Sequence, residues 1–552
     1  MTTVGLEVKE AVRTKDFYFV IDGIPIQNPE DPKGETLKGI MTAEPKAPDS
    51  IKIFIIFGLD FGYTIEATRM VYPNSVIFCY EPSDLIVEEV MSRRGKDLMK
   101  IPNLLITSNL NVLVKRIHDK YGSSEAAYIL PLDKWEKMFP KEFEEFLEKV
   151  QRIVLTRMMS RVTKEIRYKP WVDNFLLNLP FYLNSSNHGG KLINCIPPNT
   201  PVIICSAGPS LSKNVELLKG LEDKVVIVAV NTAYQSLRHY GIEPHIVASI
   251  ESVDGSSMLS DFESLNTTLM APLVVHPNML KLPFKQKILF SNFPSFYSSL
   301  FKSLGENVML ELGGSVACAA FAIGFMLGSS NIILIGQDLA FEDKEEIDYY
   351  SEGSKYNSKK TIIDKQKNLI YIPFKKEIAK EDPQFQYLGD EIPDYAALPL
   401  KYTKGWNGGD EKVPTHNHFL FFINWFESAS FNLSKSKNLF NCTEGGAYLE
   451  GFIHKTLQES LELCHVNKLK DHHLNSILGS LEANPSLKKT FKEYAANLIH
   501  MLNDEKTTIV ELEKYSELFN AYTIACKNNK REMVEKFKEF KSRFIQMYEE
   551  LN

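Results

Sequence analysis

The residues best suited to binding an anionic ligand form one short turn near the middle of the chain. An apolar run, 201–205, is followed by Ser206-Ala207-Gly208-Pro209-Ser210-Leu211. Glycine lets a backbone approach a phosphate or ribose closely, Ser210 offers a hydroxyl, and the start of a following helix presents free N–H groups. The same residues would also suit an ordinary turn in which Ser210 caps a helix. The turn therefore predicts a ligand site only together with other groups.

Four further polar turns stand after predicted strands or before predicted helices. They bring amide, hydroxyl and carboxylate groups that could bind a base, a ribose or a phosphate. These turns are Asn231-Thr232, Glu251-Ser252, Gly313-Gly314-Ser315 and Gly336-Gln337-Asp338. In an open parallel sheet, ligands bind beyond the carboxyl ends of the strands. Five such turns on one sheet edge predict a nucleotide-type ligand.

Several cofactor signatures are missing from the sequence. It has no G-x-x-x-x-G-K-[ST] loop, and the dinucleotide fingerprint is absent from the region of these turns. No His/Cys cluster has metal-ligand spacing. Glu251 and Asp338 could hold a divalent ion such as Mg²⁺, but a packing role suits them equally. We therefore expect no obligatory metal or cofactor.

The elements that must position these turns alternate between strand and helix over residues 191–440. This alternation predicts a central, Rossmann-like domain with a parallel sheet and helices on both faces. A polar stretch, 342–364, predicts a loop or lid over the site. The predicted strands are 201–205, 224–230, 245–250, 273–276, 288–291 and 331–335, and the predicted helices are 215–221, 233–240 and 315–327.

Residues 1–190 predict an N-terminal α/β domain. A buried strand (51–57), a glycine-containing turn, a helix and a second strand (75–80) that ends at Glu81 outline a nucleotide-binding βαβ unit. However, Asp60 stands where the fingerprint needs its middle glycine, and an acid there would repel a pyrophosphate. We therefore favour a structural domain without a working cofactor site, followed by a helical stretch at 134–164.

Residues 441–552 show helical periodicity almost throughout and predict a C-terminal helical domain. The stretch 507–548 places Ile509, Leu512, Leu518 and Tyr522 on one side of a helix. A packed helical bundle explains this pattern best, and a partner-binding arm is the alternative.

Composition restricts the class of protein. A chain of 552 residues is expected to form several domains, and a net charge of -7 argues against nucleic acid as the main partner. The seven cysteines are scattered without a C-x-x-C pair, which indicates reduced thiols. No signal peptide is evident, and the longest apolar stretch, 316–327, is too short to span a bilayer. We expect a cytoplasmic protein without a membrane span.

The motifs resemble those of the Maf (motility-associated factor) flagellin glycosyltransferases. The central region is also similar to bacterial sialyltransferases of the GT-A-like, single-Rossmann kind, and an archaeal pterin pyrophosphokinase shares this central fold. The matching segments are 201–211, 229–234, 241–252, 313–316, 336–341 and 441–447.

The resemblance implies a flagellin O-glycosyltransferase that serves flagellum assembly and motility. It would move a nonulosonic acid, of the pseudaminic or legionaminic acid type, from a CMP-activated donor to Ser or Thr of flagellin. Two departures put one phosphate or ribose contact in question: Ser206 replaces the first glycine of the sialyltransferase loop, and Ala207 replaces a common asparagine. By analogy, the residues that contact the nucleotide would be Gly208, Ser210, Asn231 and Ser315.

Transfer to a hydroxyl needs a general base and a group that stabilises the leaving phosphate. His416 and His418 precede a predicted helix at 419–428, and either could be the base or merely cap that helix. Tyr349 could assist the leaving phosphate. The terminal domains would recognise flagellin or bring copies of the enzyme together as a homo-oligomer. The alternatives are a pterin pyrophosphokinase and a flagellin-binding chaperone with a degenerate nucleotide fold.

Overall fold

The computed structural model divides the chain into two compact units, residues 1–162 and 163–552. The predicted domain boundaries near residues 190 and 440 stay predictions. The predicted apolar row of Ile509, Leu512, Leu518 and Tyr522 lies outside the described residues. The residues that the structure describes are 6–42, 52–120, 126–185, 192–293, 309–357, 359–374, 393–433, 436–464, 485–504 and 530–551.

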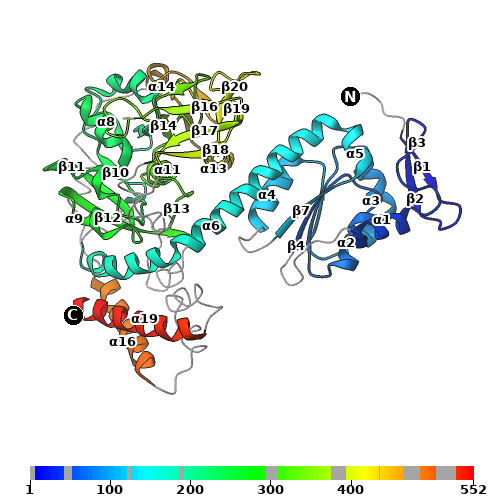
Figure 1. The fold of residues 1–552 in the computed structure, drawn as a ribbon, viewed down its shortest axis with the longest axis horizontal. Coiled ribbons are helices and arrows are strands. Elements are labelled where there is room, and N and C mark those ends of the chain that lie inside the picture. Colours follow the sequence, from blue (N-terminus) through cyan, green and yellow to red (C-terminus); the bar gives the residue numbers. More distant parts are fainter. Residues whose placement is uncertain are drawn as a thin grey trace. The chain divides into compact units, whose positions relative to one another are not determined.

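The first unit contains a four-stranded parallel sheet (Figure 1). Its strand order is β6 (Leu104–Thr107), β5 (Val76–Tyr80), β4 (Lys52–Phe57) and β7 (Ala126–Pro131). Its helices are α1 (Pro32–Thr42), α2 (Tyr63–Val71), α3 (Asp84–Leu98), α4 (Leu110–Lys120) and α5 (Asp133–Met138). An antiparallel ribbon of β1 (Leu6–Glu10), β2 (Phe17–Ile21) and β3 (Ile24–Pro25) precedes them. The predicted N-terminal α/β fold and both of its strands are confirmed.

The second unit is built on a nine-stranded sheet in which every pairing is parallel. Its central strands are fully buried apolar runs, as a sheet covered on both faces requires. The Rossmann-like α/β class is confirmed. The strand order is β13 (Met309–Glu311), β12 (Phe284–Phe293), β11 (Leu265–Pro272), β10 (Ile246–Ala248), β9 (Val226–Val230), β8 (Val202–Cys205), β14 (Asn331–Ile335), β21 (Asn438–Asn441) and β22 (Ile453–His454).

The strand order of this sheet reverses direction between β8 and β14. From β8 the chain adds strands outward to β13 and then returns to place β14 on the other side of β8. The return passes through α11 (Val316–Met326), an almost wholly buried apolar helix that Ser315 caps by accepting a bond from the Ala317 N–H. Such a topological switch point leaves a crevice at the carboxyl ends of the two strands.

The predicted strand at 273–276 is wrong. β11 ends at Pro272, and the next residues form a turn. Two asparagines of the helix α6 (Pro140–Asn184) bind the carbonyls of this segment: Asn178 donates to Leu273 and Val275 at 2.8 and 2.7 Å, and Asn174 donates to Val274 at 3.0 Å. These carbonyls therefore point to a helix and are not available to a neighbouring strand.

The helix predicted at 215–221 is shorter than expected, whereas the one at 233–240 is confirmed in type. The first is represented by α7 (Leu211–Asn214) and a 3₁₀ turn, Val215–Leu218. The second is α8 (Tyr234–His239), preceded by a 3₁₀ turn, Asn231–Ala233. Both follow directly on the strand ends that carry the predicted site.

The polar insertion after β14 is a small sheet and not only a loop. β15 (Glu346–Ile347), β16 (Thr361–Asp364), β17 (Leu369–Pro373) and β18 (Tyr395–Pro399) pair antiparallel around a core of Phe341, Ile363, Ile370 and Leu400. A hairpin of β19 (Lys401–Lys404) and β20 (Lys412–Thr415) follows and leads into α13 (Asn417–Leu433).

Helical segments complete the second unit. α16 (Pro485–Asn503) and α19 (Lys530–Leu551) share a hydrophobic core with the last turns of α6 and with residues of β11 and β12. A shorter helix, α14 (Leu457–Leu463), follows β22 and begins with a capping box at Thr456. Among the described residues, no helix is long and apolar enough to cross a membrane.

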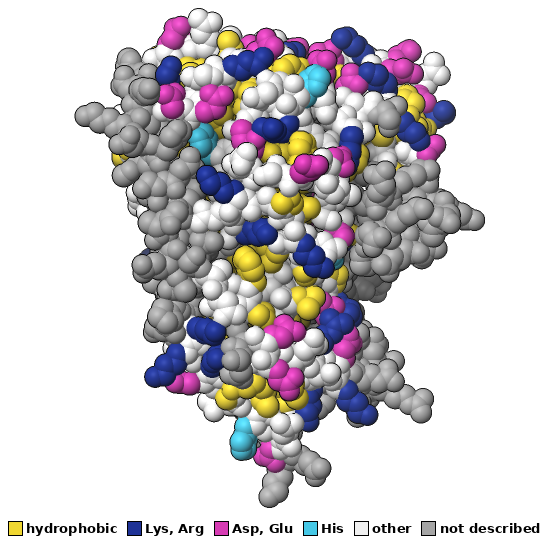
Figure 2. Space-filling view, turned by 90° about the vertical axis from the view of Figure 1, so that its left-hand side faces the viewer, with side chains coloured by type: hydrophobic (Ala, Val, Ile, Leu, Met, Phe, Trp, Pro, Cys, Tyr) yellow, Lys and Arg dark blue, Asp and Glu magenta, His cyan; other side chains and the backbone are white. Residues whose placement is uncertain are grey.

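Acidic and basic side chains alternate over the face drawn in Figure 2. On that face the described residues gather no single basic field of the kind that binds a nucleic acid backbone. This distribution agrees with the modest net charge of the chain.

We predict that Asn178→Ala destabilises the second unit by about 2 to 4 kcal/mol, because two buried carbonyls lose their donor. Leu177→Ala, at an exposed position of the same helix, should change the free energy of unfolding by less than about 0.5 kcal/mol. Urea unfolding followed by fluorescence measures both variants. Equal effects of the two substitutions would contradict the role given to the amide.

Candidate functional site at the switch point

The 206–210 loop after β8 lies directly against the 336–338 turn after β14. Ser206 Oγ donates to Gln337 Oε1 at 2.5 Å, and Ser210 Oγ donates to Asp338 Oδ2 at 2.7 Å. The Gly208 N–H donates to the Gly336 carbonyl at 2.9 Å. The structure therefore brings two of the predicted turns into one cluster at the switch point.

Gly208 is required by this close approach. A Cβ there would collide with the Asp338 carboxylate and lie 2.7 Å from the Gly336 oxygen. Gly336 itself has a φ of +64°, and a Cβ on it would collide with the Ser206 carbonyl. Both glycines serve the contact between two loops, which is a different role from the approach to a ligand that the sequence suggested.

The backbone N–H groups of the 206–210 loop are largely used inside the protein. The N–H groups of Ser206 and Gly208 bind carbonyls of the neighbouring strand end, and the Ser210 N–H donates to Asp338 Oδ1 at 3.3 Å. Pro209 has no N–H to offer. The N–H groups of Leu211, Ser212 and Lys213, at the start of α7, are bonded as well, so the expectation that the helix start offers free amides is wrong.

The end of β21 contributes a third segment, 441–447. The Thr443 Oγ accepts from the Gln337 N–H at 3.3 Å, and the Ala447 N–H donates to the Asp338 carbonyl at 2.7 Å. A Cβ on Gly446 would collide with that same carbonyl. Sequence reasoning noted this segment as part of the resemblance but did not place it in the site, because nothing local shows that β21 lies beside β14.

Asp338 is the electrostatic centre of the cluster. Burial raises the pKa of its carboxyl to about 6, against the opposing effect of the two bonds from Ser210 and the charge of Lys213. The same carboxyl orients Ser210, because the serine hydroxyl donates its hydrogen bond to Asp338. The Ser210 oxygen can still accept a hydrogen bond from a ligand. Asp338 therefore holds the two loops together, and a metal ion could bind its carboxylate only by competing with the hydrogen bonds from Ser210.

Two more predicted turns follow β9 and β10, the next strands of the sheet. The buried Asn231 amide donates to Ser249 Oγ at 3.4 Å, and its oxygen accepts from the Thr232 N–H at 2.9 Å. The Glu251 and Ser252 carbonyls accept from the His276 N–H and from Asn174 respectively. These residues lie along the same edge as the 206–210 loop.

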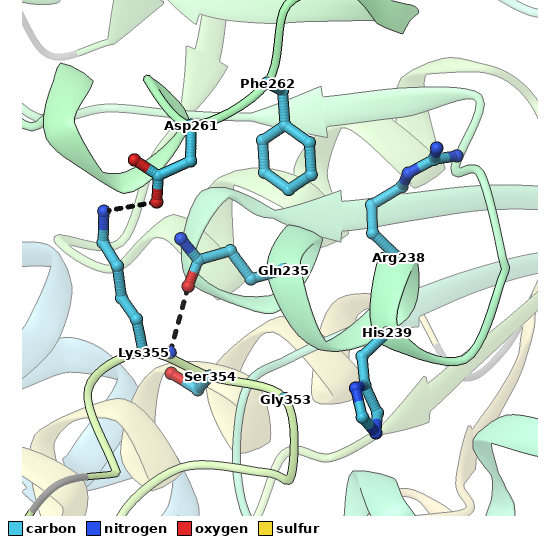
Figure 3. A pocket seen from close by; sticks show the side chains of 8 residues that line it. All are labelled: Gln235, Arg238, His239, Asp261, Phe262, Gly353, Ser354 and Lys355. Atoms are coloured by element: carbon cyan, nitrogen blue, oxygen red, sulfur yellow. Dashed lines mark hydrogen bonds and ion pairs between the residues drawn. The ribbon is translucent and has the colours of Figure 1, made fainter.

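The insertion is fixed onto this edge by a turn at 351–355. The Ser351 N–H donates to the Ala207 carbonyl at 2.9 Å, and the Glu352 N–H donates to Ser212 Oγ at 3.1 Å. The Lys355 N–H donates to Gln235 Oε1 at 3.1 Å, and its ammonium group pairs with Asp261 (Figure 3). These contacts anchor the insertion to the edge, and the predicted role of a lid stays a prediction.

An open pocket lies where the turn meets α8, beside Phe262 (Figure 3). Its cations are already paired: Lys355 with Asp261, and Arg238 with Glu243. The pocket is therefore lined by the Phe262 ring and by charged side chains whose charges are balanced by ion pairs.

The predicted catalytic residues His416 and Tyr349 meet in an aromatic cluster. Both rings pack around Phe341 and Phe419, with His416 stacked on Phe419 at a centroid distance of 4.1 Å and Tyr349 at 6.1 Å from it. The Phe341 N–H donates to the Pro414 carbonyl at 2.8 Å. Phe341 thus connects the cluster to the 336–338 turn, because it lies three residues after Asp338 in the sequence.

His416 and His418 differ sharply in environment. His416 is 2% exposed, and neither of its ring nitrogens has a hydrogen-bond partner among the described residues. Burial lowers its pKa to about 3, with a smaller effect of His418. His418 is exposed, although the surrounding protein still lowers its pKa. Burial also raises the pKa of the Tyr349 hydroxyl above its usual range.

The 313–315 turn lies against α13. A Cβ on Gly313 would be 2.5 Å from the Trp425 ring, and one on Gly314 would be 3.4 Å from Phe421. Ser315 Oγ is occupied as the cap of α11. This turn therefore lies near the helix that follows His416, and its contacts do not include the 206–210 loop.

The corresponding strand ends in the first unit are filled by the protein itself. Glu81 is fully buried and accepts from the Leu59 N–H, the Ser83 N–H and the Trp135 indole N–H at 2.9, 3.0 and 2.6 Å. Burial raises its pKa to about 8. Trp135 packs on Gly58, and Asp60 accepts from Thr64. These contacts favour the interpretation that the first unit is a structural domain without a working cofactor site.

Within the described ranges, no group of three or more His, Cys, Asp and Glu side chains could hold a metal ion.

Comparison with known proteins connects this fold to a class. Residues 173–344 match the family model described as 6-hydroxymethylpterin diphosphokinase MptE-like. The chain is similar in structure to the Maf glycosyltransferase of Magnetospirillum magneticum AMB-1, with a TM-score of 0.53 and 14% identity over 100% of this chain and 91% of that one. No curated protein matches the chain significantly in sequence. The resemblance to the Maf proteins is thus confirmed at the level of the fold.

We predict that acid destabilises the protein through His416. The unfolded chain protonates this imidazole near pH 6.5 and the folded protein only near pH 3. The contribution of His416 to the free energy of unfolding is therefore complete above pH 6.5 and decreases as the pH falls. The loss should reach about 2 kcal/mol at pH 5. Urea unfolding of the wild type and His416→Leu at pH 7 and pH 5 measures it. A pH-independent difference between the two proteins would contradict this assignment.

Proposed function

We propose that the chain is a glycosyltransferase that binds a nucleotide-activated sugar at the switch point between β8 and β14. One observation supports this most directly: Thr415 Oγ donates to the Leu339 carbonyl at 2.9 Å, which places next to the 336–338 turn the buried His416 imidazole, whose two nitrogens have no partner among the described residues. Buried polar groups in proteins are nearly always paired, so an unpaired one in such a place suits a ligand or substrate.

The donor that we propose is a CMP-activated nonulosonic acid of the pseudaminic or legionaminic acid type, and the acceptor is Ser or Thr of flagellin in the cytoplasm before export. The sequence motifs of the central region support this choice, as does the fold shared with a protein described as a Maf glycosyltransferase. The terminal parts of the chain would recognise flagellin or bring copies of the enzyme together.

In this proposal Asn231 and Ser210 bind the cytidine and ribose, and His416 is the general base, whose pKa the anionic donor would raise from its value of about 3 in the free protein. The acceptor hydroxyl gives its proton to His416, the new C–O bond forms at the sugar, and the bond to the phosphate breaks to release CMP. His416 is favoured over His418 because it shares a cluster with Tyr349 and has free nitrogens. Tyr349 would donate a hydrogen bond to the leaving phosphate.

A second candidate function is transfer of pyrophosphate from ATP to a pterin. The match of residues 173–344 to an MptE-like family model favours it. That reaction would need a tightly held Mg²⁺. The two functions therefore differ in nucleotide and in metal requirement.

We expect calorimetry to show that the purified protein binds CMP in preference to UMP, GMP and ATP without added Mg²⁺. Asn231→Ala should weaken CMP binding at least tenfold, about 1.4 kcal/mol, because the buried amide loses its ligand contact. Asn111→Ala, at an exposed helix position of the first unit, is the control.

Other outcomes of this titration identify the alternatives. Preference for ATP with a strict Mg²⁺ requirement would favour the pyrophosphokinase. If no nucleotide binds, the proposed transferase is wrong and a flagellin-binding chaperone becomes the better reading.

We predict that His416→Gln lowers sugar transfer by about a hundredfold or more, the usual contribution of a general base, while CMP binding is retained. Single-turnover transfer to purified flagellin, read by intact mass, measures the rate. His418→Gln is the matched comparison and should change the rate much less. A large loss for His418→Gln alone would move the base to that residue.

A further inference from the structure

The 206–210 loop has few amides to offer a phosphate, because the N–H groups of Ser206, Gly208 and Ser210 are bonded within the protein. The nearest carboxylate, Asp338, would repel an anion in its charged form. A donor phosphate at this edge therefore needs a positive side chain, unless a metal ion supplies the charge.

Lys213 is an exposed residue beside the contact between the 206–210 loop and the 336–338 turn. Its ammonium group donates to the Glu444 carbonyl at 3.0 Å. A Cβ on Gly445 would lie 3.1 Å from that nitrogen and 3.8 Å from the Ser210 Cβ. The lysine head thus sits between the 206–210 loop and the 441–447 segment, and its charge is close enough to affect the Asp338 carboxyl.

The charge of Lys213 is not neutralised by an ion pair. Among the residues that the structure describes, no carboxylate lies within ion-pair distance of its ammonium group, and its side chain is exposed. The lysines of the nearby insertion differ in this respect: Lys344, Lys355 and Lys360 each pair with an aspartate or glutamate. A lysine that has a carbonyl but no carboxylate partner, beside a loop whose amides are largely occupied, is an arrangement that an anionic ligand would complete.

We infer that Lys213 binds the phosphate of the nucleotide donor and stabilises it as the leaving group. This inference rests on the proposed function, since it assigns the counter-charge within the same site. No atom of Lys213 changes its bonding during the reaction: the sugar carbon–oxygen bond breaks with its electron pair on the phosphate, and the ammonium group balances the charge that develops there.

Calorimetric titration of CMP and of cytidine into the full-length protein tests the inference. The variants are Lys213→Gln, which keeps a donor for the Glu444 carbonyl but removes the charge, and Lys213→Arg, which keeps the charge. Lys219→Met is the control, because this lysine pairs with Glu216 on the exposed side of the same segment. We expect Lys213→Gln to weaken CMP binding about tenfold or more and to leave cytidine binding unchanged. Lys213→Arg should restore most of the affinity.

The comparison of the two ligands separates a failure of the inference from a failure of the proposed function. If the wild type binds CMP more tightly than cytidine and Lys213→Gln keeps the same ratio, the inference is overturned while the nucleotide site stands. If Lys213→Gln weakens both ligands equally, Lys213 only holds the 441–447 segment in place, and the inference is again wrong. If the wild type binds neither ligand, the inference and the proposed function both fail.

Discussion

The close contact between the 206–210 loop and the 336–338 turn is the constraint on which the rest of the site depends. At a switch point the connections that follow the two neighbouring strands leave in opposite directions, and here the Asp338 carboxyl joins them by accepting two bonds from Ser210. Gly208 and Gly336 permit the approach, and Gly446 allows a third strand end to join it. The insertion is then fastened to the outer side of the same loop through Ser351.

This bridging has an electrostatic cost that shapes the proposed chemistry. Burial of Asp338 raises its pKa into the physiological range, and its bonds use the N–H and O–H groups that such a loop would otherwise offer to a ligand. The loop is thereby held in place, but it has few N–H groups left to bind an anion. A polar ligand at this edge has to be recognised by side chains around the loop, among them Asn231, Lys213 and the aromatic cluster of His416.

The sequence predicted the class of fold and most of the strands because buried parallel strands are continuous apolar runs, such as 202–205 and 331–335. It misplaced the strand at 273–276 because a local apolar pattern cannot reveal that Asn174 and Asn178 bind those carbonyls. Strand-end logic also led to the 206–210 and 336–338 turns, which do meet. It could not show that the 441–447 segment lies beside them, since that depends on the position of β21 in the sheet.

The two parallel sheets of the chain show why topology alone does not make a site. Both have a switch point, between β4 and β7 in the first unit and between β8 and β14 in the second. In the first, Trp135 covers Gly58, and three donors satisfy the Glu81 carboxylate, so the buried acid at this crevice already has internal partners. In the second, the described residues leave around the loops a lysine without a carboxylate partner and a buried imidazole without a hydrogen-bond partner. The physical difference between a structural domain and a candidate active site lies in such groups, because a ligand can satisfy what the protein leaves open.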